Sequence, residues 1–161
     1  MLMYVPAVAE RLGATVHRYS WSARPAAVFE PGIETWVADQ VGPFLDAIGG
    51  SPLLIGKSLG TNAVALAASR ALPAVWLTPL LTVPWVVDAL SAATAPFLLV
   101  GGTADRLWDG EAARRLSPHV MEVEGADHGM FVQGPVIESI TVLAQIVTAV
   151  ESFFDTIDWP N

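Results

Sequence analysis

Short apolar runs alternate with longer amphipathic stretches along this chain. Residues 33–48 place apolar side chains three and four positions apart and end at Gly49, a pattern that predicts a helix. By contrast, the runs "PLLI" (52–55), "AVWL" (74–77) and "FLLV" (97–100) are apolar at every position. Continuous apolar runs of this length are typical of strands covered on both faces, as in a parallel sheet.

Strands and helices are therefore expected to alternate. The expected helices cover Val5–Leu12, Ile33–Ile48, Leu59–Ala71, Pro84–Leu90, Gly110–Leu116 and Ile137–Phe154. The expected strands cover Ala14–Trp21, Pro52–Ile55, Ala74–Leu77, Pro96–Val100 and His119–Val123, with a loop over residues 22–32. In the last helix, the face expected to be buried carries Ile140, Leu143, Val147, Val150 and Phe154. This order predicts the α/β class, as a three-layer α/β/α sandwich with a mainly parallel sheet of about five strands.

Composition agrees with a well-packed interior. The chain has 161 residues, of which 53% are hydrophobic and 15% charged, so it is too apolar to stay disordered and long enough for one core. We expect a single domain over residues 1–161. The chain has no cysteine, which excludes disulfides, thiolate metal sites and cysteine nucleophiles.

Charge and hydropathy narrow the expected partners and location. The net charge of −8 repels phosphate backbones, so we do not expect nucleic-acid binding. The apolar run over residues 71–87 is interrupted by Pro73, Pro79 and Pro84, which argues against a membrane span. The N-terminus lacks a basic stretch followed by a cleavage site, so a cytoplasmic location is expected.

The stretch "GGSPLLIGKSLGT" (49–61) fits two chemistries. Gly56-Lys57-Ser58 resembles the end of a nucleotide-binding P-loop. That motif needs another glycine five positions before Gly56, where this chain has Ser51, with Gly50 one position too early. The residues between form an apolar run instead of an open phosphate-binding loop. A nucleotide-binding protein using Gly56-Lys57-Ser58 therefore remains only a remote alternative.

The same residues fit the G-x-S-x-G turn of a serine nucleophile. "GKSLG" follows an apolar run that is expected to be a strand and precedes the Ala-rich "TNAVALAASRA". This is the strand–turn–helix context in which Ser58 would sit in a strained backbone at the tip of the turn. Gly56 and Gly60 are expected because side chains there would collide with neighbouring backbone. A Gly-rich turn with a helix-capping serine is the alternative.

A serine nucleophile needs a base and an oriented acid, expected in the order Ser, acid, His. Asp105 follows the strand before Gly101-Gly102, and His128 follows the next strand. Each could instead be an ordinary loop residue. Asp109 competes as the acid, but its position predicts a helix cap. Asp127 is expected to point away from His128, while His17 and His119 stand in the wrong order.

On the motifs "GKSLG", "GGTAD" and "GADHGM", the chain resembles the α/β-hydrolase fold family. The resemblance runs from about Leu2 to Phe154 and is strongest to small, lidless, esterase-like bacterial serine hydrolases. It implies that Ser58 is the nucleophile, Asp105 the acid and His128 the base. It also implies that the backbone N–H of Leu59 is one oxyanion-hole donor. No metal or organic cofactor is expected.

The chain departs from that family near its N-terminus. Family members have a strand and an oxyanion loop before the first helix, and the loop supplies a second oxyanion donor. Neither is seen here, nor is the strand that would lie between those near residues 14 and 52. We expect either a truncated start or a shortened sheet, with an exposed edge that could support a homo-oligomer. Losing one oxyanion donor costs on the order of 10²–10³ in rate.

These observations predict a serine hydrolase that cleaves small or medium carboxylic esters through an acyl-enzyme on Ser58. Thioester or amide substrates stay open. The alternative is a weak or inactive hydrolase-fold protein that binds a partner. Four apolar residues could line an acyl pocket or belong to the core: Leu80, Leu81, Val83 and Trp85.

Overall fold

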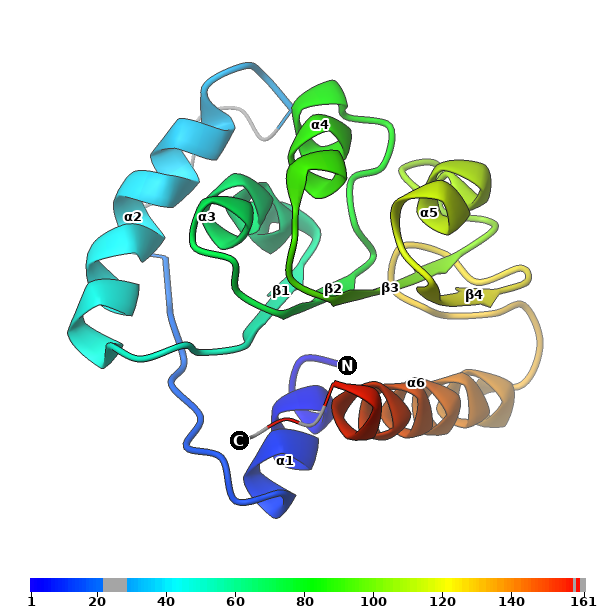
Figure 1. Ribbon diagram of the computed structural model, residues 1–161. Helices are drawn as coiled ribbons and strands as arrows, with labels where there is room; N and C mark the ends of the chain where they lie inside the picture. The colour runs from blue at the N-terminus through cyan, green and yellow to red at the C-terminus, as the bar shows by residue number, and fades with distance from the viewer. Residues whose placement is uncertain (22–28, 158, 160–161) are drawn as a thin grey trace.

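The computed structural model describes residues 1–21, 29–157 and 159, and its centre is a four-stranded parallel sheet (Figure 1). The strands are β1 (Leu54–Lys57), β2 (Ala74–Leu77), β3 (Phe97–Gly102) and β4 (His119–Val123). They lie side by side in the order β1-β2-β3-β4, and each neighbouring pair is parallel. The predicted α/β class with a parallel sheet is confirmed, with four strands instead of about five.

Helices cover both faces of this sheet (Figure 1). One face carries α1 (Tyr4–Arg11) and α6 (Val136–Thr156). The other carries α2 (Ile33–Ile48), α3 (Val64–Ser69), α4 (Pro84–Ala92) and α5 (Gly110–Leu116). The helices of the three connections between successive strands all lie on this second face. Each connection crosses back over the sheet, so every strand runs parallel to the one before it.

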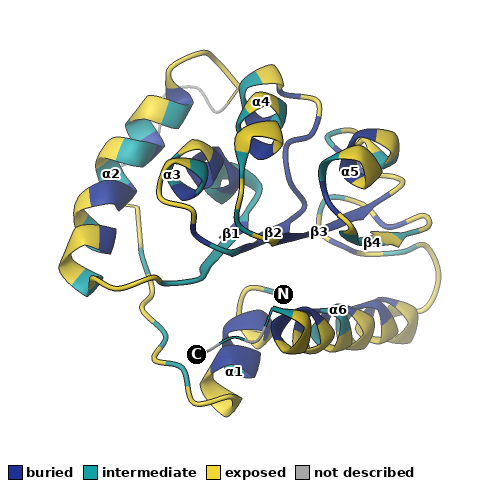
Figure 2. Ribbon diagram, viewed as in Figure 1, coloured by how far each residue is buried: buried dark blue, intermediate teal, exposed yellow. Residues whose placement is uncertain are grey.

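The core consists of two apolar clusters, one on each side of the central strands. Trp76 and Leu99 join the cluster under α2–α5, whereas Val75 and Val100 join the cluster over α1 and α6. These four side chains are at most 1% exposed. Figure 2 shows β2 and β3 buried along their length. Apolar residues at every position of these strands are therefore explained by burial on both faces.

The predicted strand over Ala14–Trp21 is wrong. Within the described residues this segment is extended but carries no strand pairing, and its neighbour β1 is only half-buried. A cavity of about 710 Å³ is lined by residues 14–21 on one wall and by Leu53–Lys57 on another. β-branched and aromatic residues form a strand only when a neighbouring strand accepts their backbone hydrogen bonds. Of the predicted loop over residues 22–32, residues 22–28 lie outside the described residues.

Three other boundaries differ from the predicted ones, two of them because of strand pairing. β1 begins at Leu54 instead of Pro52, because its hydrogen bonding to β2 starts where the Leu54 N–H donates to the Pro73 carbonyl. The helix predicted to start at Leu59 begins with a 3₁₀ turn, η1 (Ser58–Ala63), before α3. β3 continues through Gly101-Gly102, which pair with the end of β4.

The buried face of α6 agrees with the expected one in part. Val150 and Phe154 are fully buried as predicted, but Ile140 is 54% exposed, and Val142, Ile146 and Phe153 also join the core. Apolar residues lie on more than one side of this helix, so spacing alone does not fix which stripe is buried. By length and composition α6 could cross a membrane, but its buried stripe faces the protein core.

The geometry of β1 predicts unequal protection of neighbouring amides. The Leu54 N–H donates to Pro73 over 3.0 Å, and strand alternation directs the Ile55 N–H to the opposite, open edge. We expect Ile55 to exchange at least about tenfold faster than Leu54 in amide hydrogen exchange measured by NMR. Equal protection of the two amides would contradict an open β1 edge.

Candidate active site

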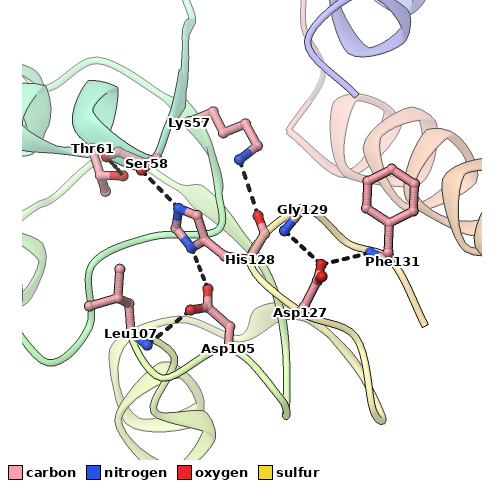
Figure 3. Close-up of polar contacts among 9 residues, drawn as sticks. All are labelled: Lys57, Ser58, Thr61, Asp105, Leu107, Asp127, His128, Gly129 and Phe131. Atoms are coloured by element: carbon pink, nitrogen blue, oxygen red, sulfur yellow. Dashed lines mark hydrogen bonds and ion pairs between the residues drawn. The ribbon is translucent and has the colours of Figure 1, made fainter. Parts of the chain in front are cut away.

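Three loops at the carboxyl ends of β1, β3 and β4 bring Ser58, Asp105 and His128 together (Figure 3). Ser58 Oγ lies 2.8 Å from His128 Nε2. His128 Nδ1 lies 2.7 Å from Asp105 Oδ2. The three residues are separated by up to 70 positions in the sequence, so only the parallel sheet makes this contact chain. The predicted trio therefore forms a continuous hydrogen-bonded line.

The donors and acceptors in this line follow from the groups present. An ionised Asp105 carboxylate can only accept, so the proton of the neutral imidazole is on Nδ1. His128 Nε2 then carries the lone pair and accepts a hydrogen bond from the Ser58 hydroxyl. In this arrangement the imidazole is oriented to take the serine proton.

The turn that holds Ser58 is strained in the way the G-x-S-x-G motif predicts. Ser58 has a φ of +51°, a left-handed conformation that side chains rarely adopt. A Cβ on Gly56 would lie 2.6 Å from the Trp76 ring and 2.9 Å from the Gly60 carbonyl oxygen, so a side chain has no room there. At Gly60 a Cβ would meet nothing within 4 Å, and the expected collision at that position is wrong.

Buried polar residues just beneath the turn fix its backbone. The Thr61 hydroxyl donates to the Ser58 carbonyl over 2.6 Å. The Asn62 amide donates to the Leu59 carbonyl and accepts from the Trp85 indole N–H. Sequence reasoning missed these contacts. The signal was present, since Thr61-Asn62 is a polar pair at the start of an otherwise apolar helix.

Asp105 is held in a nearly closed environment. Its side chain is 2% exposed, against 35% for His128. The second carboxylate oxygen accepts the Leu107 N–H at 3.0 Å, which fixes the orientation of Oδ2 toward the imidazole. The acid loop also binds the histidine loop, because the Ala104 N–H donates to the Ala126 carbonyl. The two loops are therefore positioned relative to each other by backbone contacts.

The competing carboxylates have structural partners instead. Asp109 caps α5 by accepting the Ala112 N–H at 2.9 Å, as its position predicted. Asp127 accepts the N–H groups of Gly129 and Phe131 and so closes the loop around His128. Figure 3 shows its carboxylate turned away from the imidazole.

Lys57 provides a cationic contact that sequence reasoning did not find. Its Nζ donates to the backbone carbonyl of His128 over 3.1 Å (Figure 3). Burial lowers the pKa of Lys57 below its usual 10.5, while the charges of Asp105 and Asp127 oppose that shift. No open phosphate-binding loop leads to Lys57, because β1 occupies that position.

The other predicted residues fall in different places. The Leu59 N–H lies in the first turn of η1, where N–H groups have no carbonyl partner within the helix. His119 packs edge-on against Phe153, and His17 lies on the exposed segment before α2. Among the proposed acyl-pocket residues, Leu80, Leu81 and Val83 are at most 7% exposed and Trp85 packs on the same core cluster. These positions agree with the packing alternative.

Strained backbone conformations are concentrated in the loops at the carboxyl ends of the strands. Among described residues other than glycine, positive φ occurs at Ser58, Ala71, Thr78 and Met130. Three of these four follow β1, β2 and β4 at their carboxyl ends. Such strain is concentrated at functional sites, where the surrounding structure enforces it. The distribution agrees with a functional site at this edge.

No protein-family model matches the chain, and no curated protein sequence matches it. Among solved structures, the chain is similar to the crystal structure of the monoacylglycerol lipase of Paleococcus ferrophilus. The TM-score is 0.56 and the sequence identity 18%, over 75% of this chain and 76% of that chain. At this identity the likeness supports an α/β-hydrolase-like fold.

The two glycines of the turn predict different costs of substitution. Gly56→Ala is expected to reduce the free energy of unfolding by about 1–3 kcal/mol, because its methyl group overlaps Trp76 and the Gly60 carbonyl. Gly60→Ala is the matched control and is expected to change it by less than about 0.5 kcal/mol. Denaturant unfolding measures both. Equal losses in the two variants would contradict this packing of the turn.

Proposed function

We propose that this protein is a serine hydrolase that cleaves small or medium carboxylic esters through an acyl-enzyme on Ser58. The observation that carries the proposal is the line from Ser58 Oγ through His128 to Asp105, with contacts of 2.8 and 2.7 Å. The strained turn at Ser58 and the α/β-hydrolase-like fold support it independently.

In the proposed mechanism, His128 Nε2 takes the proton as Ser58 Oγ attacks the ester carbonyl carbon. The resulting imidazolium is stabilised by Asp105, whose 2% exposed side chain keeps water from weakening the interaction. The imidazolium then protonates the departing alcohol, which leaves the acyl group on Ser58. Water, activated by His128, cleaves that acyl-enzyme and restores the serine.

The negative charge on the carbonyl oxygen needs donors as it develops. The Leu59 backbone N–H is the proposed donor, because it follows the nucleophile at the start of a helical turn.

The acyl and alcohol groups of the substrate are open to experiment. The structural neighbour is a monoacylglycerol lipase, which makes monoacylglycerols a sensible addition to short p-nitrophenyl esters. The substrate set should also include a thioester and an amide, since the same attack on a carbonyl serves all of them.

A second candidate is a hydrolase-fold interaction protein with weak or no turnover. The half-buried edge of β1 and the adjacent cavity of about 710 Å³ favour it, because an open strand edge can pair with another chain. A homo-oligomer formed through this edge is one form of the proposal. Light scattering at several protein concentrations distinguishes it from a monomer.

The nucleophile is tested by covalent labelling. We expect a fluorophosphonate probe to label the wild-type protein and Ser58→Ala to remain unlabelled, because Ser58 Oγ lies 2.8 Å from the proposed base, His128 Nε2. Intact mass spectrometry measures the label, and circular dichroism checks that both proteins are folded. Equal labelling of both, or no labelling of folded wild type, would reject the serine-hydrolase proposal.

The acid is tested by a matched pair of substitutions. Asp105→Asn is expected to lower turnover by about 10⁴-fold, because an amide holds the imidazole in the wrong tautomer. Asp109→Asn should leave turnover within about twofold, because asparagine also caps helices well. Initial rates on p-nitrophenyl butyrate measure both. A similar loss in the two variants would argue against Asp105 as the acid.

A further inference from the structure

Lys57 is the one lysine in the chain, and it occupies the position immediately before the proposed nucleophile. Its side chain is half-buried. Nζ donates to the carbonyl of His128, a residue 71 positions away in the sequence. The residue before the proposed nucleophile is thus attached to the backbone of the proposed base.

This contact joins the two loops whose separation decides whether proton transfer is feasible. Ser58 follows β1, while His128 follows β4, and two strands lie between them in the sheet. The imidazole reaches Ser58 by its side chain alone, and that side chain is 35% exposed. The Lys57–His128 bond adds a connection from a side chain to the His128 backbone across the same gap.

We propose that Lys57 is a positioning residue, which holds the His128 backbone so that Nε2 stays within reach of the Ser58 hydroxyl. The inference rests on the proposed serine-hydrolase function. A misplacement of about 1 Å between reacting groups can lower a rate about a hundredfold. The predicted effect is therefore on the acylation step and not on ester binding.

The charged groups around Lys57 give this role a pH dependence. Asp105 on the acid loop and Asp127 on the histidine loop carry negative charges that favour the protonated form of Lys57. Burial acts in the opposite direction and is the larger effect, so the pKa of Lys57 lies below its usual 10.5. As the pH rises through that pKa, Nζ loses its charge and its bond to the carbonyl weakens. Acylation should then decline.

The experiment compares Lys57→Met, Lys57→Arg and wild type, with Arg70→Met as the matched control. Methionine keeps the apolar stem and removes the donor, whereas arginine keeps a charged donor at every accessible pH. Arg70 pairs with Asp46 on the partly exposed surface, so its variant removes one positive charge outside the site. The rate of Ser58 acylation by p-nitrophenyl butyrate, the rate of Ser58 phosphonylation by the fluorophosphonate, kcat and KM on the ester, and thermal midpoints are measured for all four proteins.

We expect Lys57→Met to acylate about 10–100-fold more slowly with KM and thermal midpoint little changed. Lys57→Arg should recover a large part of that loss, and Arg70→Met should match wild type. The wild-type acylation rate should fall at alkaline pH, and the midpoint of this fall should equal the midpoint of the Lys57 Nζ titration. NMR measures that titration directly, because the chain has one lysine. That alkaline decline should be absent from Lys57→Arg.

Two results would overturn the inference while the proposed function stands. One is an acylation rate of Lys57→Met equal to that of wild type. The other is an equal decrease of the acylation rate in Lys57→Met and Lys57→Arg. If wild type itself is not labelled, the proposed function fails. The positioning role of Lys57 is then tested by NMR of the His128 ring. Unchanged His128 ring resonances in Lys57→Met would overturn that role, and shifted resonances would support it.

Discussion

Parallel hydrogen bonding among four strands is the constraint on which the site depends. Because all strands run in one direction, β1, β3 and β4 each release their loop at the same edge of the sheet. Antiparallel pairing would send alternate loops to opposite ends, separating Ser58 from Asp105 or His128. The apolar strands β2 and β3 hold this register from the interior, buried on both faces. Core packing and site geometry are therefore set by the same hydrogen bonds.

The close approach of these loops requires strained backbone at the carboxyl ends of the strands. Ser58 adopts a left-handed conformation, and Gly56 and Gly102 lie where a side chain would overlap Trp76 or Ala126. Strained backbone costs about 1–3 kcal/mol per residue and persists only where the surroundings enforce it. Here the enforcement comes from the Thr61 bond to the Ser58 carbonyl and from the packed layer below. Three of the four strained residues other than glycine in the described part of the chain follow the carboxyl ends of strands, where the chemistry is proposed.

The sequence predicted correctly the bounds of elements that depend on local pattern. The helix over Ile33–Ile48 and the strand over Ala74–Leu77 have the expected bounds, because glycine or proline and a clear apolar pattern delimit them. Extended residues 14–21 failed as a strand because pairing depends on a partner that their own pattern does not encode. The open space at Gly60 likewise depends on neighbours in three dimensions.

The candidate site divides in the same way. The order of Ser58, Asp105 and His128 at strand ends sufficed to expect their meeting, since parallel topology turns order into proximity. The contact between Lys57 and the His128 carbonyl had no such signal, because a lysine beside a serine also fits a surface position or a phosphate site. Which carbonyl an ammonium reaches is decided by loop geometry at a separation of 71 residues.

Electrostatics explain why a lone lysine matters at this position. The chain carries a net charge of −8, yet Asp105 is ionised in the proposed mechanism while its side chain is 2% exposed. Burial of a carboxylate is costly unless hydrogen bonds and opposite charge replace the lost water. The Leu107 N–H and the imidazole supply the hydrogen bonds, and Lys57 supplies positive charge nearby. The side chain at position 57 is thus bonded to the loop of the proposed base and lies within electrostatic range of the proposed acid, so one cation is close to both partners of the proposed proton transfer.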